Sequence, residues 1–266
     1  MGKSSDRILQ ELEAERIRRQ SLTRSDLQRM YAELRGAGFP LKGRIDFICD
    51  LGGSNELEYH YELICNDWET GGQLHLDNSF DKHDLDGLDF LFSAIGNAPN
   101  ERVRIFTAYL IAEILTRSKH RDFYKPKCSQ LIPILTTHLD IPDHILRRKV
   151  LIALGWVGST DELAHLCGHM LHDEDSLCRA CSASSLWQLL ANERQADGPI
   201  PPKVCEAFGH AISAETDPFA CGVMIESVQA LFNKRWVSSS AVENRDTERI
   251  EKARKSATRF LTRLQK

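Results

Sequence analysis

The chain has 266 residues, of which 42% are apolar and 27% charged, and its formal net charge is −4. This composition is typical of globular proteins and excludes a mostly disordered or fibrous chain. No stretch approaches the roughly 18 uncharged apolar residues of a membrane span, and the charged start predicts no secretory signal. Eight cysteines without an export signal predict reduced thiols and a cytoplasmic location.

Charge is distributed unevenly along the chain. Residues 1–44 carry ten Lys and Arg against six Asp and Glu, residues 45–91 carry one against twelve, and residues 233–266 carry ten against four. An acidic segment therefore lies between a basic start and a basic end. Such asymmetry bears on the choice of partners rather than on the fold.

Residues 1–43 are predicted to form an N-terminal helical segment. Ser25 and Gln28 have the spacing of a capping box, which marks the start of a helix. The pattern ends at Gly36. The apolar residues at helical spacing between these points are Leu27, Met30, Tyr31 and Leu34.

Residues 44–83 form an acidic insertion in which the period of the apolar residues changes. Near residues 44–78 apolar and polar residues alternate, and glycine pairs at 52–53 and 71–72 separate the runs. The alternating apolar residues are Ile45, Phe47, Leu57, Tyr59, Tyr61, Leu63, Leu74 and Leu76. This pattern predicts a small β-meander insertion. Part of the stretch also fits one face of a helix, so both alternatives stay open.

The middle of the chain, residues 84–232, repeats itself. The stretch from Asp143 reads as Asp, three residues, Arg, and then Ala-Leu six residues later, and the stretch from Asp175 repeats this pattern with Ser-Leu. Weaker copies begin at Asp217 and Arg102. Each copy reads as the second helix of a pair, and the three aspartates stand where an N-cap belongs. Residues 84–232 therefore predict about four helix pairs.

Residues 233–266 predict a basic helix that closes the array. Five apolar residues make one stripe along it, namely Ile250, Ala257, Phe260, Leu261 and Leu264. We expect this stripe to cap the last repeat, with the basic residues facing solvent.

The repeat pattern resembles the HEAT-repeat family, in particular its short bacterial type. The resemblance is best over residues 142–190, where a Leu-Gly pair at 154–155, an apolar helix and an Asp-rich turn precede Arg179 and an Ala-rich helix. It implies an all-α fold, an α-solenoid of about four helix pairs whose second helices line the concave face. It also implies that Arg147 and Arg179 are ladder arginines that pair with turn carboxylates such as Asp143 and Asp175, and that the ladder stops at Cys221.

Histidines and cysteines cluster between residues 165 and 181. They are His165, Cys167, His169, His172, Cys178 and Cys181. A zinc site needs about four converging ligands. The repeat register instead directs the cysteines toward the core and the histidines outward, so we expect no metal and no cofactor.

The chain lacks the motifs of several enzyme classes. No nucleophile elbow, P-loop or dinucleotide-binding fingerprint occurs. No histidine is followed by Glu, unlike the repeated His-Glu pairs of the di-iron hydroxylases with this type of repeat. We therefore expect that the protein is not an enzyme.

The remaining candidates are interaction residues. Trp187 lies opposite the core direction of its helix, and Trp156 flanks the preceding second helix beside Lys149, next to Arg148. Trp and Arg are favoured at interface hot spots. The alternative is that both tryptophans pack against an adjoining repeat. The acidic segment adds Asp81, Asp84 and Asp86, for which a solvated loop leading into a helix is the simpler interpretation.

We expect a non-catalytic protein–protein interaction scaffold. One concrete form is a regulatory or immunity-type binder whose acidic segment masks a basic partner. The alternative is a nucleic-acid-binding protein or a relative of the HEAT-like alkylpurine DNA glycosylases, which would use the tryptophans and a basic strip of Arg102, Arg104, Arg148 and Lys149. The acidic balance of the chain disfavours this alternative. The sequence does not separate a scaffold from an accessory subunit of an enzyme.

Overall fold

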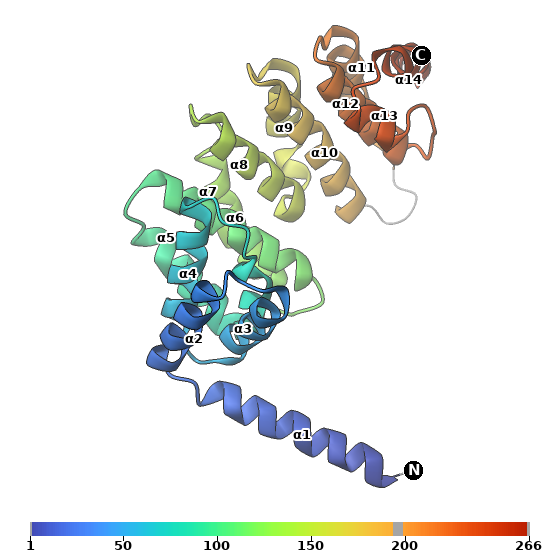
Figure 1. The fold of residues 1–266 in the computed structure, drawn as a ribbon. Coiled ribbons are helices and arrows are strands. Elements are labelled where there is room, and N and C mark those ends of the chain that lie inside the picture. Colours follow the sequence, from blue (N-terminus) through green and yellow to red (C-terminus); the bar gives the residue numbers. More distant parts are fainter. Residues whose placement is uncertain (1, 194–198, 265–266) are drawn as a thin grey trace. The chain divides into compact units, whose positions relative to one another are not determined.

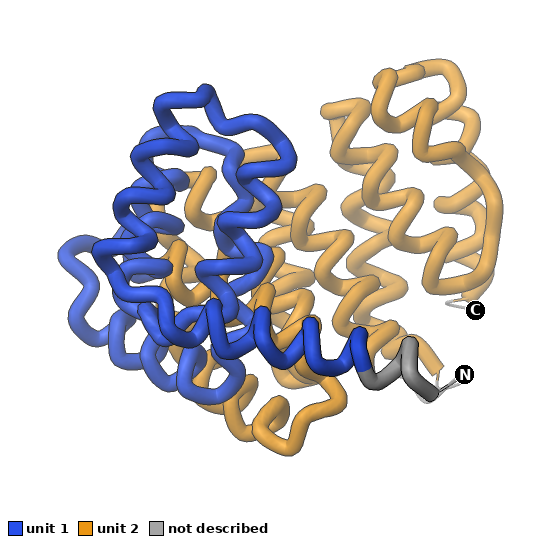
Figure 2. The backbone as a smooth tube through the Cα atoms, turned by 60° about the horizontal axis from the view of Figure 1, so that its bottom comes forward, with its two compact units in different colours: residues 1–104 blue, residues 105–266 orange. Residues whose placement is uncertain are grey.

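The computed structural model describes residues 2–193 and 199–264, and every regular element in these residues is a helix (Figure 1). The chain divides into two compact units, residues 1–104 and residues 105–266 (Figure 2). The boundary falls inside α6 (Glu101–Arg117). The predicted all-α fold class is confirmed.

Unit 1 consists of helices that follow one another with short connections. They are α1 (Gly2–Gln20), α2 (Arg24–Gly36), α3 (Leu41–Gly53), α4 (Leu57–Glu69), the 3-10 helix η1 (Leu76–His83) and α5 (Asp84–Gly96). The helices α2, α3, α4 and α5 bury apolar residues from Leu27 to Ile95 in a common core. Residues 2–20 and 24–36 are helical, and α3 begins at Leu41.

The predicted β-meander near residues 44–78 is wrong. This stretch folds as most of α3, as α4 and as the start of η1, and the described part of the chain contains no strand. The buried residues of α4 recur at helical spacing and are Tyr59, His60, Leu63 and Ile64. The exposed Glu58 and Glu62 lie one turn apart on the other face, and they produced the alternation that resembled a strand.

The glycine pair at 52–53 ends α3 instead of forming a hairpin turn. A Cβ atom on Gly52 would lie 2.6 Å from Ser79, and one on Gly53 would lie 2.8 Å from the side chain of Arg19. The missing side chain of Gly52 therefore lets η1 pack closely on α3, and that of Gly53 lets α1 do so.

The capping box of α2 lies two residues earlier than Ser25 and Gln28. Thr23 is the N-cap, and its hydroxyl accepts a hydrogen bond from the Asp26 N–H at 3.3 Å. The Asp26 carboxylate accepts the Thr23 N–H at 3.2 Å in return. Asp takes the role that Glu or Gln has in the usual box.

A pair of histidines lies in the core of unit 1. His60 is fully buried, and its Nε2 lies 2.9 Å from the carbonyl oxygen of Leu76. Because a carbonyl only accepts, Nε2 carries the proton, and Nδ1 accepts the proton of His83 Nε2 at 2.9 Å. The Phe80 ring contacts both imidazoles. Burial lowers the pKa of His60 to about 3 and that of His83 to about 4, although Asp81 acts to raise the latter.

This pair makes the protein sensitive to acid. Above about pH 6.5 both histidines are neutral in the folded and in the unfolded chain. As the pH falls from 6.5 toward 4, only the unfolded chain takes up protons, so the free energy of unfolding falls by up to about 1.4 kcal/mol per pH unit for each histidine. Urea unfolding at several pH values checks this expectation, and NMR of the two rings at pH 5 should show them neutral. A stability that is unchanged between pH 7 and 4.5 contradicts it.

Unit 2 stacks helix pairs. After α6 come α7 (Tyr124–Thr136), α8 (His144–Val157), the 3-10 turn η2 (Thr160–Glu162), α9 (Leu163–His172), α10 (Ser176–Glu193), α11 (Pro202–Ala214), α12 (Pro218–Leu231), α13 (Ser239–Glu243) and α14 (Thr247–Leu264). The second helices α8, α10 and α12 pack side by side, and the first helices α9 and α11 pack against each other and against the second row. Three pairs follow one another in this unit, namely α7 with α8, α9 with α10, and α11 with α12.

The N-caps of the second helices are confirmed. Asp143 accepts hydrogen bonds from the N–H groups of Ile145 and Leu146 at 2.9 and 3.2 Å. Asp175 accepts the N–H of Cys178, and Asp217 that of Ala220, both at 2.8 Å. The capping aspartate thus fixes the start of each second helix and the register of the repeat.

A ladder of arginines connects successive pairs. Arg147 on α8 donates both to Asp173 in the next turn, at 2.8 Å, and to the carbonyl oxygen of Ile141 in its own turn, at 2.5 Å. Arg179 on α10 repeats this with Glu215, at 2.7 and 2.8 Å, and with the carbonyl oxygen of Asp173, at 2.8 Å. Ladder arginines are thus confirmed.

The carboxylates of the ladder are not the predicted Asp143 and Asp175. Those two residues cap their own helices, whereas the residues two places before the caps, Asp173 and Glu215, accept the guanidinium groups. Burial raises the pKa of Asp173, but hydrogen bonds from Arg147, the Asp175 N–H and His169 outweigh it and lower that pKa overall. The carboxylate is therefore ionised and fully engaged.

The ladder continues past Cys221. At the last repeat a cysteine stands where the arginine would be, and Arg254 of α14 donates instead to the carbonyl oxygen of Glu215 at 2.8 Å. The apolar side of α14 packs on α11, α12 and α13 with Ile250, Ala253, Ala257 and Leu261 buried. This helix thus covers the end of the repeats, with Arg254 as part of the contact, although Leu264 of the predicted stripe is 48% exposed.

Removal of one ladder arginine should cost far more stability than removal of its neighbour. Arg147→Ala leaves the buried Asp173 without its main partner, so we expect a loss of about 3 to 5 kcal/mol in the free energy of unfolding. Arg148→Ala is the matched control, because its partner Asp175 is about one-fifth exposed, and we expect at most about 1 kcal/mol. Urea denaturation checks both values. Equal losses in the two variants contradict a special role for the ladder.

Candidate functional site

The second helices of unit 2 place equivalent residues on one face. The residue two places after each capping aspartate is apolar, namely Ile145, Leu177 and Phe219. Ile145 is 56% exposed, and the other two are partly exposed. We call these three residues the apolar row. Since α8, α10 and α12 pack side by side, the row crosses all three helices.

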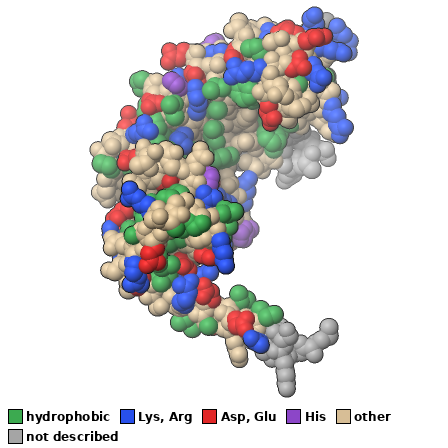
Figure 3. All heavy atoms as spheres, viewed as in Figure 1, with side chains coloured by type: hydrophobic (Ala, Val, Ile, Leu, Met, Phe, Trp, Pro, Cys, Tyr) green, Lys and Arg blue, Asp and Glu red, His purple; other side chains and the backbone are tan. Residues whose placement is uncertain are grey.

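The next turn continues the same face. Lys149, Cys181 and Val223 stand six residues after the caps, and all three are partly exposed. We call the face of α8, α10 and α12 that carries both rows the inner face. Figure 3 shows hydrophobic side chains gathered over α8 and α10 in this part of unit 2. The inner face thus combines one exposed and several partly exposed apolar side chains, and apolar surface that stays accessible to solvent can mark a protein interaction site.

An aromatic cluster borders the inner face at α6. The ring of Trp156 lies 5.2 Å from that of Tyr109, and the ammonium group of Lys149 lies 4.1 Å from the Tyr109 ring centroid. Phe106 lies on the other side of this ammonium group, at 5.8 Å. The structure thus brings together two of the predicted interaction residues, Lys149 and Trp156. Their contacts also hold α8 against α6.

Comparison with known protein families adds one finding. Residues 88–187 match the model of HEAT repeats, and the match runs from within α5 to within α10 and includes the ladder arginines 147 and 179. This part of the chain contains HEAT repeats. No curated protein and no solved structure matches it. In the described residues no helix is long and apolar enough to cross a membrane.

Two further predicted residues lie on these HEAT repeats but act differently. Arg148 forms a bidentate pair with Asp175 at 2.9 and 2.7 Å, and this pair stabilises the turn between α9 and α10. Trp187 on α10 is 36% exposed, which is unusual for so large an apolar side chain. The structure therefore assigns Arg148 to the scaffold and leaves Trp187 accessible.

The acidic candidates lie in unit 1, at the junction of η1 and α5. Asp86 is exposed in the first turn of α5, and Asp84 starts that helix with a positive φ of 52°. Asp81 is half-buried, and its Oδ1 is buried without a hydrogen-bond partner. The three carboxylates thus differ in environment, and only Asp86 faces open solvent without constraint.

The histidines and cysteines between residues 165 and 181 lie in different environments: His165 and His172 are exposed, Cys167 and Cys181 are partly exposed, and Cys178 is buried. His169 lies 2.9 Å from Asp173 through Nδ1, so it joins the ladder, and Cys178 is fully buried. Among the described residues no group of three His, Cys, Asp or Glu side chains is placed to hold a metal ion. Burial raises the pKa of the Cys167 and Cys181 thiols to about 11, which opposes a reactive thiolate near neutral pH.

The apolar row was missed by sequence reasoning. Its signal was the fixed distance from the capping aspartates: Ile145, Leu177 and Phe219 all lie at the second position after the cap. A residue in the first turn of a helix looks like part of the amphipathic stripe until the packing of its neighbours is known.

The most accessible thiol should be that of Cys49 in unit 1. Cys49 in unit 1 is exposed, whereas Cys178 is fully buried and its thiol pKa is raised to about 12. On treatment with iodoacetamide near neutral pH, we expect Cys49 to be alkylated first and Cys178 and Cys181 at least about tenfold more slowly. Peptide mass spectrometry over a time course measures this. Modification of Cys178 as fast as Cys49 contradicts its burial, and equally fast modification of Cys181 contradicts the raised pKa of that thiol.

Proposed function

We propose that the protein is a non-catalytic scaffold that binds a protein partner on the inner face of its HEAT repeats. The observation that carries the proposal is the apolar row, in which three equivalent residues at the starts of adjacent helices are exposed (Ile145) or partly exposed (Leu177 and Phe219). Burial of such a row by a partner gains about 25 cal/mol per Å² of apolar surface.

The surroundings of the row support a partner with an amphipathic segment. Lys149 lies on the inner face beside the row, and Glu226 stands on the same face of α12. Apolar residues in the middle with charged residues around them are the usual composition of a protein interface. A helix that presents residues at i, i+7 and i+14, about 10.5 Å apart, would match a row that crosses three helices packed about 8 to 10 Å apart.

A regulatory or immunity-type binder is the specific form we propose. Residues 45–91 carry one basic residue against twelve acidic ones, and of these Asp46, Glu58 and Asp86 are exposed and form no ion pair among the described residues. Such a surface attracts a basic partner and speeds its association. The eight free cysteines support a reducing compartment, and we propose the cytoplasm.

The structure favours this function over nucleic-acid binding at the same face. Of the predicted basic strip, Arg102 stacks on the Trp68 ring at 4.7 Å, Arg148 is paired with Asp175, and Lys149 contacts Tyr109. Three of the four cations are thus engaged within the protein, and of the strip only Arg104 is partly exposed without a side-chain contact of this kind among the described residues.

Substitution of the row should abolish partner binding. We expect Ile145→Asp with Leu177→Asp to reduce recovery of the partner about tenfold or more in an affinity pull-down from nuclease-treated lysate read by mass spectrometry. Both sites lie in a first helical turn, where Asp is tolerated. Leu41→Asp with Ile45→Asp is the matched control, since these residues of α3 are 63% and 51% exposed, and it should retain the partner.

The same assay tests the acidic segment. Asp86→Lys should weaken the complex and reduce its dependence on salt. Recovery that is equal for the wild type and the row variant refutes the proposed face. Recovery that is unchanged by Asp86→Lys at low and high salt removes this carboxylate from the interaction.

A further inference from the structure

From Lys252 onward, every charged residue of α14 is basic. From Lys252 to Leu264 the chain has five Lys and Arg and no Asp or Glu. One of the five, Arg254, belongs to the ladder. The other four are exposed, and within the described chain none of them forms an ion pair; they are Lys252, Lys255, Arg259 and Arg263.

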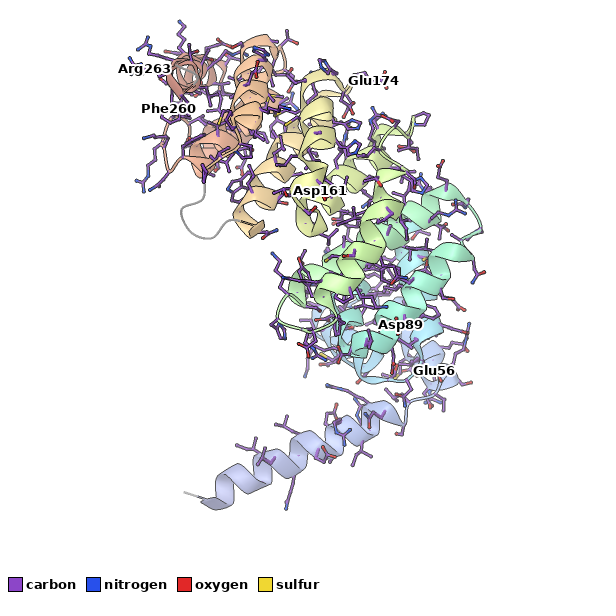
Figure 4. The ribbon with its side chains drawn as sticks, turned by 180° about the vertical axis from the view of Figure 1, so that it is seen from behind. Glu56, Asp89, Asp161, Glu174, Phe260 and Arg263 are labelled. Carbon is purple, nitrogen blue, oxygen red and sulfur yellow. The ribbon has the colours of Figure 1, made fainter. Side chains whose placement is uncertain are left out.

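A groove runs between this basic surface and α11. Its volume is about 590 Å³, and it is lined by Ser213, Arg254, Lys255, Thr258, Arg259, Thr262 and Arg263. The lining thus combines four cationic side chains with three hydroxyl groups and contains no carboxylate. Figure 3 shows Lys and Arg side chains gathered at this end of unit 2, and Figure 4 labels Arg263 on α14.

The helix dipole of α14 accounts for only part of these positive charges. A positive side chain near a helix C-terminus interacts favourably with the helix dipole, but the effect is confined to about the last turn. This accounts for Arg263, whereas Lys252 and Lys255 lie two or more turns earlier in α14. Single exposed cations without an ion pair also occur elsewhere in the described residues, such as Arg35, but on α14 four of them share one helix. The unpaired charge on α14 therefore points to an external anion.

The geometry favours a regular polyanion. Lys255, Arg259 and Arg263 are four residues apart, which places them about 6 Å apart along one face of the helix. Each strand of a nucleic acid carries one phosphate per about 3.4 Å of axis, so a row of cations can follow its backbone. Arg, Lys, Ser and Thr are the side chains that contact phosphates in such complexes.

Two other classes of anionic partner fit less well. A protein interface needs an apolar centre and is depleted in Lys, whereas this groove has no large exposed apolar side chain in its lining. A membrane surface would require an exposed apolar side on the helix. The apolar side of α14 is instead buried, with Ile250, Ala257 and Leu261 in the core.

We propose that this surface binds the phosphate backbone of a nucleic acid without reading its sequence. Lys255, Arg259 and Arg263 contact successive phosphates, and the hydroxyl groups of the groove donate further hydrogen bonds. The site is separate from the inner face, so one protein can hold a protein partner and a nucleic acid together.

Fluorescence anisotropy with a short labelled DNA duplex tests the proposal on the full chain. The variant Lys255→Gln/Arg259→Gln/Arg263→Gln should bind at least about tenfold more weakly at low salt, and the slope of log K against log salt should fall by about 3 between roughly 50 and 200 mM salt. The matched control is Arg35→Gln/Lys42→Gln/Lys125→Gln. It removes the same charge from other exposed positions and should bind like the wild type.

Three results would overturn the proposal. They are no binding by the wild type at low salt, equal loss in both triple variants, and tighter binding to polyglutamate or to phosphatidylserine vesicles than to the duplex. Circular dichroism confirms that both variants are folded. Recovery of the protein partner should be unchanged in the α14 variant, so failure here and failure of the inner-face function are separate outcomes.

Discussion

The buried contacts between guanidinium groups and inter-helix turns hold the repeat array together. In each turn the residue two places before the cap offers a carbonyl oxygen to its own arginine, and in two turns it offers a carboxylate to the preceding arginine as well. Removal of the partner of a buried charge strongly destabilises the fold. The spacing of successive pairs is therefore set by the reach of Arg147 and Arg179, and the inner face inherits this spacing.

The register of the repeats was predictable because it depends on local chemistry. A capping aspartate, a proline at the first helical position and an arginine four residues after the cap are all visible in the sequence, and Asp143 and Asp217 cap as expected. The long-range partners were not predictable. Asp173 and Asp175 have equivalent side chains, and only the folded turn decides that one caps its helix and the other accepts Arg147.

The errors in unit 1 have a common physical origin. The alternation of apolar and polar residues over α4 and the glycines at 52–53 suggested strands joined by a turn. The sequence does not show that α4 buries one helical face or that η1 and α1 approach the two glycines closely. The same limit applies to the candidate sites. Sequence placed Arg148 and Lys149 in one basic strip, but their side chains leave the helix in different directions, one to Asp175 and one to Tyr109. The apolar row became visible only once α8, α10 and α12 were adjacent.

Arg254 gives the array a defined end. It occupies the carbonyl oxygen that an arginine at position 221 would use, and it does so from a helix whose apolar side already covers α11 and α12. A further repeat added after α12 would have to displace α14, and with it the donor to the Glu215 carbonyl oxygen. We therefore expect repeats to be gained or lost during evolution only between α8 and α12. There the arginine of each repeat can pair with the carboxylate in the following turn. The length of the inner face can change in steps of one helix pair while the basic terminal helix stays in place.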